Sequence, residues 1–199
     1  MIANTRRAWL PGDARGFRNR GHRIHSSGDY RNPPPGNEHE GLRRYHRERS
    51  GKPVSLTLEV RILVLKAFVQ KMRKLGYRII TASCGEKHLH GVAELVADYR
   101  ECRKIVGKCK QKASHAVRDH LRGTIWAEGG SHEPIRDPGH FHNTYKYIRT
   151  KQEAGTVVWS HRPDEDWINA PSIGIVVMGL NKRRIRVFAG AQTPASERK

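Results

Sequence analysis

The sequence predicts an α+β domain. Three observations support this class: one segment whose apolar residues recur at helical spacing, two short runs that read as paired strands, and two further segments with helix start and stop signals. At 199 residues, the chain has room for one domain with extensions, but not comfortably for two. We therefore expect a single domain of mixed structure.

The charge of the chain indicates a polyanionic partner. Lys and Arg number 38 against 19 Asp and Glu, giving a formal net charge of +19 and an isoelectric point near 10.5. This excess is far larger than solubility requires, so nucleic acid is the expected partner. Composition alone leaves open a ribosomal-type or generally adhesive basic protein, and the motifs have to distinguish them.

The cysteines and the apolar runs suggest a cytoplasmic protein. Cys84, Cys102 and Cys109 form no CxxC pair, so neither a zinc knuckle nor a disulfide framework is indicated. The first residues contain no apolar leader segment, and the longest apolar run, residues 173–180, is too short to cross a bilayer. We expect a soluble protein that is not exported and has no membrane partner.

The chain divides into three regions. Residues 1–52 are rich in Arg, Gly, Pro and His and lack periodicity, which predicts a basic arm or long insertion; "GHRIHSS" in it is a weak candidate for a first strand. Residues 53–160 carry the regular elements of the domain. Residues 161–199 form an extension in which "SIGIVVMGLNKRRIRVF" predicts a hairpin, followed by a basic tail.

The first helix is predicted within "SLTLEVRILVLKAFVQKMRKLG", residues 55–76. Its apolar stripe is formed by residues three and four apart: Leu58, Ile62, Leu65, Val69 and Met72. Ser55 or Thr57 can cap its start, and Gly76 suits the left-handed residue that ends it.

A β-hairpin is predicted next, with "YRIITAS" as one strand, "CGEK" as the turn and "HLHGVAEL" as the other strand. Side chains alternate between faces along a strand. Leu89 therefore belongs to the core face, and His88 and His90 share the other face.

A basic helix is predicted from Asp98 to Gly123, with Asp98 as its cap and Glu101 three residues on. Its charges suit either a solvated face or a face that follows DNA phosphates, and the charge of the whole chain favours the second. The residues expected to contact DNA are Lys87, Arg103, Lys104, Lys108, Lys112 and Arg118.

Another helix is predicted from Pro138 to Gly155, capped by Asp137, and "VVWSHRPDEDW" after it reads as a connection. Phe141, Tyr145 and Ile148 make its buried stripe, so Tyr145 is most simply a core residue. Tyr147 instead falls on a polar face with Asn143, Thr150 and Lys151.

The paired histidines and this tyrosine together suggest phosphodiester chemistry. Residues two apart in a strand lie roughly 7 Å apart on one face, so His88 and His90 can reach one ion; two surface histidines are the alternative. Tyr147 could attack a phosphodiester. A phenol with a pKa near about 10 is mostly neutral at pH 7 and would need a metal to polarise the phosphate.

These residues resemble the single-tyrosine HUH transposases, a family that includes insertion-sequence and REP-associated tyrosine transposases. His88-Leu89-His90 matches the His-hydrophobe-His motif, and Tyr147-Ile148 in "YKYIRTKQEAG" matches the place of the nucleophile. The basic helix with "KQKASHAVRDHL" and the following "GTIW" extend the resemblance, which covers roughly residues 57–160. The tyrosine follows the histidines in the chain, an order that disfavours the relaxases.

The resemblance implies a ferredoxin-like or RRM-like antiparallel sheet with packed helices. It also implies cleavage and rejoining of single-stranded, hairpin-forming DNA through a 5′-phosphotyrosine, with Mg²⁺ or Mn²⁺ as cofactor; ligand softness alone would favour zinc. Monomer and homodimer both remain open. A second hypothesis is a catalytically inactive, domesticated relative that binds structured DNA or RNA. An RRM-type RNA-binding domain is disfavoured because residues 88–95 offer no stacking aromatic ring.

The third metal ligand is the point at which the sequence departs from the family. Family members often carry Gln or Asn one helical turn after the tyrosine, and here that position is Lys151, whose ammonium cannot bind metal. Gln152 is the expected third ligand, provided that the helix is locally irregular. Asn143, one turn before Tyr147, is the second choice.

Overall fold

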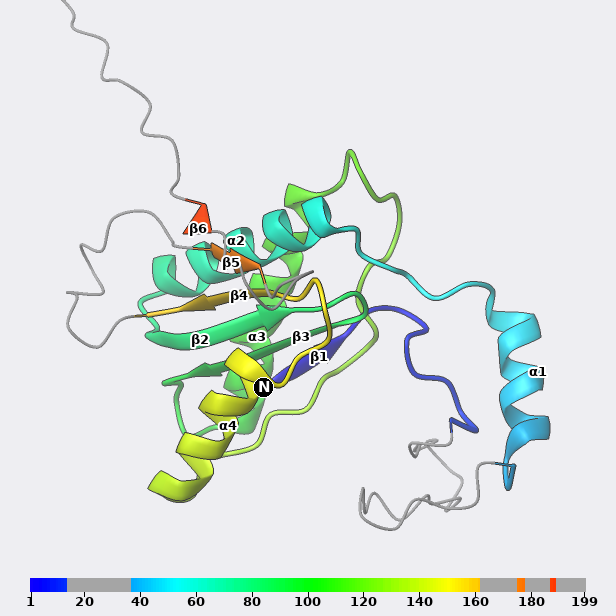
Figure 1. The fold of residues 1–199 in the computed structure, drawn as a ribbon, viewed down its shortest axis with the longest axis horizontal. Helices are drawn as coiled ribbons and strands as arrows, with labels where there is room; N and C mark the ends of the chain where they lie inside the picture. The colour runs from blue at the N-terminus through cyan, green and yellow to red at the C-terminus, as the bar shows by residue number, and fades with distance from the viewer. Residues whose placement is uncertain (14–36, 162–174, 178–186, 189–199) are drawn as a thin grey trace, which may run out of the picture.

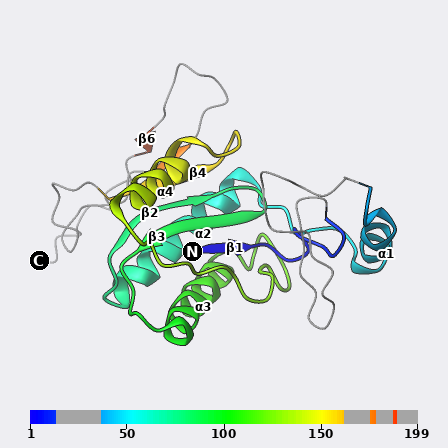
Figure 2. The ribbon, with the colours of Figure 1, turned by 90° about the horizontal axis from the view of Figure 1, so that it is seen from below.

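The protein is an α+β domain, as the sequence predicts. The computed structural model describes residues 1–13, 37–161, 175–177 and 187–188. Its antiparallel sheet has the strand order β1-β3-β2-β4-β5-β6. Helices α2 and α3 cover one face of the sheet and helix α4 covers the other (Figures 1 and 2). No helix of the described part of the chain is long and apolar enough to cross a membrane.

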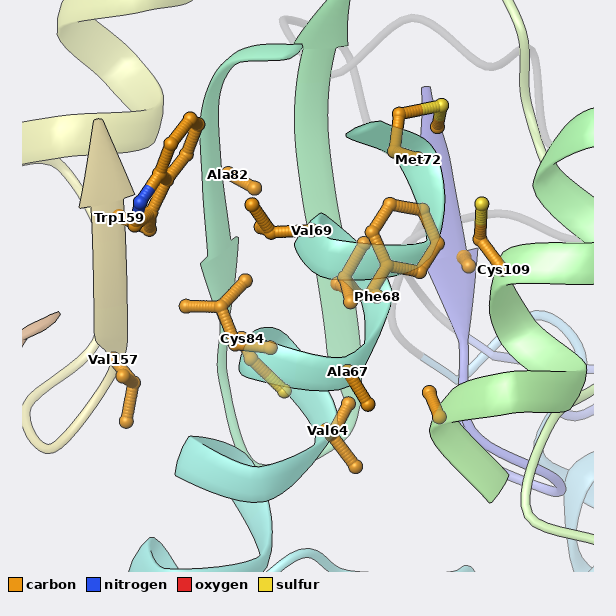
Figure 3. Packing of buried hydrophobic residues seen from close by; sticks show 14 of the residues in the cluster. Val64, Ala67, Phe68, Val69, Met72, Ala82, Cys84, Cys109, Val157 and Trp159 are labelled. Atoms are coloured by element: carbon orange, nitrogen blue, oxygen red, sulfur yellow. The ribbon is translucent and has the colours of Figure 1, made fainter. Parts of the chain in front are cut away.

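Helix α2 (Leu58–Lys74) is the centre of the core. The Thr57 hydroxyl accepts a hydrogen bond from the Val60 amide, which confirms one of the two predicted caps. Helix α2 packs against β2 and β4 and also against α3, and Figure 3 shows Phe68 and Met72 of α2 on the side near Cys109 of α3. Because α2 is covered on two sides, its buried face is wider than the predicted stripe: Val60, Val64, Leu65, Ala67, Phe68, Val69 and Met72 are buried.

Two members of the predicted stripe lie outside that face. Leu58 is 40% exposed, and Ile62 is only partly buried. The three-and-four spacing located the helix correctly, but the stripe it predicted is rotated relative to the face that is buried. The spacing assumes one contact face, whereas α2 contacts both the sheet and α3.

The predicted hairpin is confirmed. Strands β2 (Ile79–Cys84) and β3 (His88–Ala93) pair antiparallel, with Cys84 opposite Leu89. The Gly85 amide donates to the His88 carbonyl across the turn. Leu89 is 1% exposed on the core face, while both histidines are half-buried on the opposite face.

The first strand is not where the sequence suggested. Strand β1 (Ile2–Asn4) pairs antiparallel with β3, whereas "GHRIHSS" falls outside the described residues. Because β1 and β2 run parallel on either side of β3, with α2 between them in the chain, they form a split β-α-β unit. Strand β1 was not predicted because three residues are too few to show the alternation of apolar and polar side chains that marks a strand.

The basic arm also contains a helix that the sequence did not predict. Helix α1 (Glu40–Ser50) has no buried side chain. Gly12 lies against its backbone so closely that a Cβ there would come 2.4 Å from the Arg43 amide nitrogen. Leu42 and Tyr45 are the only large apolar residues of this helix, too few to mark an apolar stripe in the sequence, which is why the segment was predicted as part of an arm or long insertion.

Helix α3 (Tyr99–Ala116) begins at the predicted cap, where Asp98 accepts from the Glu101 amide. It ends seven residues before the predicted Gly123, since the fully buried Val117 leaves the helical conformation and the chain turns there. Helix α4 (Pro138–Thr150) begins at Asp137, whose carboxylate accepts from the His140 amide, and ends before the predicted Gly155.

The predicted connection after α4 is wrong in its first part. Residues Val157–Ser160 form strand β4, which pairs antiparallel with β2. Val157, Val158 and Trp159 are all buried because this strand has covered faces on both sides of the sheet, so it reads as a continuous apolar run and lacks alternation. The C-terminal strands β5 (Ile175–Val177) and β6 (Val187–Phe188) pair antiparallel as predicted, and the residues between them lie outside the described part.

Candidate metal and nucleophile site

Strand β3 and helix α4 form the candidate site on the sheet face away from α2. The His88 and His90 rings project from β3 toward α4, with their centroids 4.7 Å apart. The prediction that His88 and His90 share one face of the strand is therefore confirmed. The two imidazoles are close enough to bind one ion or one ligand oxygen together.

Tyr147 of α4 lies against His90 of this pair. Its ring centroid is 5.7 Å from that of His90, edge to face, and the side chain is 49% exposed. The neighbouring Ile148 is 2% exposed and anchors this turn of α4 on the sheet. The hydroxyl-bearing ring is thus held at the histidines while remaining open to a substrate.

Tyr145, the other tyrosine of α4, points elsewhere. Its ring stacks on Phe141 with centroids 5.9 Å apart, and its hydroxyl accepts a hydrogen bond of 3.0 Å from Arg149. It is only half-buried, so the predicted core role is wrong: of the predicted stripe, Ile148 alone is buried. The side chain does not line the cavities beside His90.

Gln152 reaches the histidines because α4 ends two residues earlier. Lys151 is the C-terminal cap residue and is exposed, so its ammonium does not stand in the site. Gln152 Nε2 donates to the Tyr147 carbonyl at 3.0 Å, which leaves its Oε1 3.3 Å from His88 Nε2. Asn143, the second choice for this role, is exposed on α4 and lines neither of the cavities described below.

The donor atoms have the spacing that a divalent ion requires. Ligand bonds of about 2.1 Å at right angles put neighbouring ligand atoms about 3 Å apart, close to the separation of His88 Nε2 and Gln152 Oε1. Gly85 contributes space: a Cβ there would come 2.9 Å from His88 Nε2 and 2.7 Å from Glu153 Oε1. Within the described residues, no three His, Cys, Asp or Glu side chains are grouped so as to hold a metal ion; the predicted third ligand is the amide oxygen of Gln152.

The protonation of His90 suits a ligand. Burial, and then the charge of neighbouring His88, lowers the pKa of His90 from 6.5 to about 4. The ring is therefore neutral at pH 7, and one of its nitrogens keeps a lone pair for a metal ion or a proton.

A basic groove opens from this site. It is lined by the two histidines, Tyr147, β1, residues 7–13, α1 and residues 51–53. It has a volume of about 990 Å³. Its only described carboxylate is that of Asp13, against five cations: Arg7, Arg43, Arg47, Lys52 and Lys87. Only Lys87 of these was predicted. The others belong to the N-terminal region, whose basic composition was visible in the sequence but whose position was not.

A second cavity of about 810 Å³ lies on the other side of Tyr147. It extends beneath α4, and its lining includes Phe141 and Ile148 together with the carboxylates of Glu94, Asp98 and Glu133. His90 and Tyr147 line both spaces, so they stand between a groove lined mainly by cations and a cavity that carries acidic side chains.

The basic residues predicted on the third helix are not part of this site. Arg103, Lys104, Lys108, Lys112 and Arg118 are exposed on or just after α3, behind the sheet (Figure 2), and line neither cavity. Two of them also face carboxylates: Lys104 pairs with Glu101 at 2.6 Å, and Arg118 lies 3.7 Å from Asp119.

Comparisons of the chain with models of protein families, with curated proteins and with solved structures return no match.

Proposed function

We propose that the protein is a metal-dependent tyrosine nuclease and strand transferase that acts on single-stranded, hairpin-containing DNA, with the fold and chemistry of the single-tyrosine HUH transposases. Tyr147 is the nucleophile. His88, His90 and Gln152 would hold Mg²⁺ or Mn²⁺. The observation that carries the proposal is the convergence, from β3, α4 and the segment after α4, of two histidines, a neutral amide oxygen and an exposed tyrosine.

The reaction is a transesterification. Tyr147 Oη loses its proton and attacks the phosphorus of a DNA phosphodiester; the new O–P bond forms as the bond to the 3′ oxygen breaks. The leaving oxygen takes up a proton to become a 3′ hydroxyl, and the 5′ phosphate stays on Tyr147. A 3′ hydroxyl that attacks the phosphotyrosine reverses these steps, so rejoining needs no nucleotide cofactor. A bound divalent ion would polarise the phosphate and offset the charge that develops on it.

The residues of the chain position this chemistry. Gln152 ties the end of α4 to His88 by contacting both, so the nucleophile's helix and the histidine strand keep one arrangement. The neutral state of His90 leaves it able to act as a ligand at physiological pH.

Adduct formation tests the proposal. Purified protein incubated with Mn²⁺ and a single-stranded hairpin oligonucleotide should form a covalent product that survives denaturing electrophoresis. Tyr147→Phe should abolish it. Tyr145→Phe is the matched control, because it removes the same hydroxyl from the same helix, and it should leave the adduct intact. Persistence of the adduct in Tyr147→Phe would contradict the assignment of the nucleophile and point to Tyr145.

One observation favours a second function, a non-catalytic binder of structured DNA or RNA. Within the described residues, no three His, Cys, Asp or Glu side chains are grouped so as to hold a metal ion, which makes the donor set at His88 and His90 lean for a catalytic ion. That function predicts tight, salt-sensitive nucleic-acid binding, no adduct with any metal, and unchanged affinity in Tyr147→Phe.

A further inference from the structure

The basic groove identifies a surface for the substrate strand that differs from the one the sequence suggested. We propose that a single strand of DNA binds along the N-terminal segment and α1, with its backbone phosphates on Arg7, Arg47 and Lys52, and enters the site from that side. The proposal rests on the proposed function in one respect: that the strand bound in the groove is the one that Tyr147 cleaves.

Charge and continuity support this path. Five cations and one described carboxylate line a groove whose far end is formed by His88, His90 and Tyr147. A phosphate backbone lying in it would therefore lead to the nucleophile without leaving the cationic surface. The basic face of α3 has no such continuity, since its exposed Arg and Lys side chains line neither of the spaces beside Tyr147.

The construction of α1 supports the same path. None of its side chains is buried, so its sequence does not contribute to the core. The helix nevertheless lies against Gly12, where a Cβ would meet backbone atoms of Arg43 at less than 3 Å. Helix α1 therefore contributes nothing to the core; what it adds beside the site is an exposed surface to which a ligand can bind.

Arg7 is held by an unusual backbone. It is the only non-glycine residue of the described part with a positive φ, 65°. Its guanidinium lies against Gly51, at the end of α1, where an added Cβ would come 3.0 Å from Nη1. A strained conformation persists only where the surrounding structure fixes it, and here it directs a cation across the groove toward α1.

Trp9 makes the groove suitable for unpaired bases. Its indole is 37% exposed in the groove lining, among the arginines. Surfaces that bind single strands combine cations for the backbone with aromatic rings on which bases stack, and stacking of this kind is closed to a base within a duplex. The chemistry of the groove therefore favours a single strand over double-stranded DNA.

Matched double variants test the proposal in a Tyr147→Phe background, which removes cleavage from the binding measurement. Arg47→Ala/Lys52→Ala removes one Arg and one Lys from the groove; Arg103→Ala/Lys108→Ala removes the same charges from α3. All four side chains are exposed, so both variants should keep the parent's circular dichroism and melting temperature. Affinity for a fluorescent single-stranded oligonucleotide is measured by anisotropy across a salt series.

The groove variant should bind at least about tenfold more weakly than the parent, and the slope of log K against log salt should fall by about 1.4, the value for two lost contacts to a single strand. The α3 variant should change affinity by less than about twofold. Equal losses in both variants, a larger loss on α3, or a parent that does not bind the oligonucleotide would each overturn the proposal.

The adduct assay keeps this proposal separate from the proposed function. With Tyr147 present, the groove variant should form adduct at a reduced rate that rises to the parent's rate as DNA concentration is raised. If the parent forms the adduct but the groove variant binds the oligonucleotide as tightly as the parent, the groove proposal alone is contradicted. If the groove variant binds more weakly as expected but the parent forms no adduct, the catalytic function alone is contradicted.

Discussion

At the scale of single residues, Gln152 decides whether the paired histidines have a third protein ligand. Its amide is fixed by the Tyr147 carbonyl, so its Oε1 faces His88 without needing to be reoriented. Preorganisation of this kind is what a weak neutral ligand needs to contribute to binding.

Replacing Gln152 with Ala should therefore weaken Mn²⁺ binding at least about tenfold, measured by isothermal titration calorimetry on the DNA-free protein. Lys151→Ala is the matched control, because Lys151 is the adjacent residue and is exposed, and its affinity for Mn²⁺ should stay within about twofold of the parent's. Equal affinities in Gln152→Ala and the parent would remove Gln152 from the ligand set.

The residues of the site were predictable to different degrees. Alternation along a strand is a backbone property, so residue spacing is enough to place His88 and His90 on one face. The helical turn that separates Tyr147 from Tyr145 was also readable from spacing. The position of Gln152 was not, since it depends on where α4 ends, and helix ends are the least regular part of a helix.

At the scale of elements, the turn between β2 and β3 controls the site through the small size of one residue. Gly85 leaves space into which His88 and Glu153 both project, and Glu153 uses it to accept a hydrogen bond from the Glu86 amide at 2.9 Å. Any side chain at position 85 has to displace one of these neighbours.

Gly85→Ala should lower Mn²⁺ affinity and adduct yield by about tenfold or more, because its Cβ forces the His88 ring to move. The fold should persist, since the contacts made are with side chains. Gly107→Ala on α3, where nothing lies within 4 Å of the added Cβ, should leave metal binding unchanged and raise the melting temperature slightly. If metal affinity is undiminished in Gly85→Ala, the space beside His88 is not part of the site.

The elements found from sequence were those with local signals. Thr57, Asp98 and Asp137 each cap a helix as predicted, because a cap depends only on the three or four residues that follow it. Strand β4 was missed because Val157, Val158 and Trp159 alternate in no visible way when both faces are covered. Helix α1 and strand β1 were missed because neither buries a periodic stripe.

At the scale of the whole molecule, α2 packs both against the sheet and against α3, so its burial joins the two. Phe68 (Figure 3) is fully buried at this position, whereas Leu58 on the same helix is 40% exposed.

Phe68→Ala should lower the free energy of unfolding by about 3–5 kcal/mol, and Leu58→Ala by less than about 1 kcal/mol, both measured by urea denaturation. The sequence stripe would rank them otherwise, since it includes Leu58 and omits Phe68. A loss in Leu58→Ala as large as that in Phe68→Ala would mean that the observed burial does not describe the core.

The arrangement of charge over the whole molecule could not be read from composition. The net charge of +19 predicts a polyanion but not the surface that meets it. The cations of the basic groove come mostly from the N-terminal region, because β1 returns that region to the edge of β3, a contact between residues more than eighty positions apart.

That same contact sets an order of events in folding. Ile2 is opposite His90 and Asn4 is opposite His88, and the Met1 amino group donates to the Gly91 carbonyl. During synthesis, the first residues have to wait until some ninety more have been added before they find their partners. Contacts between residues so distant in the chain form late, because a long loop has to close before they stabilise anything. The histidine strand β3 gains its second neighbour only at that stage, so the basic groove and the face that carries His88 and His90 become complete together with the fold.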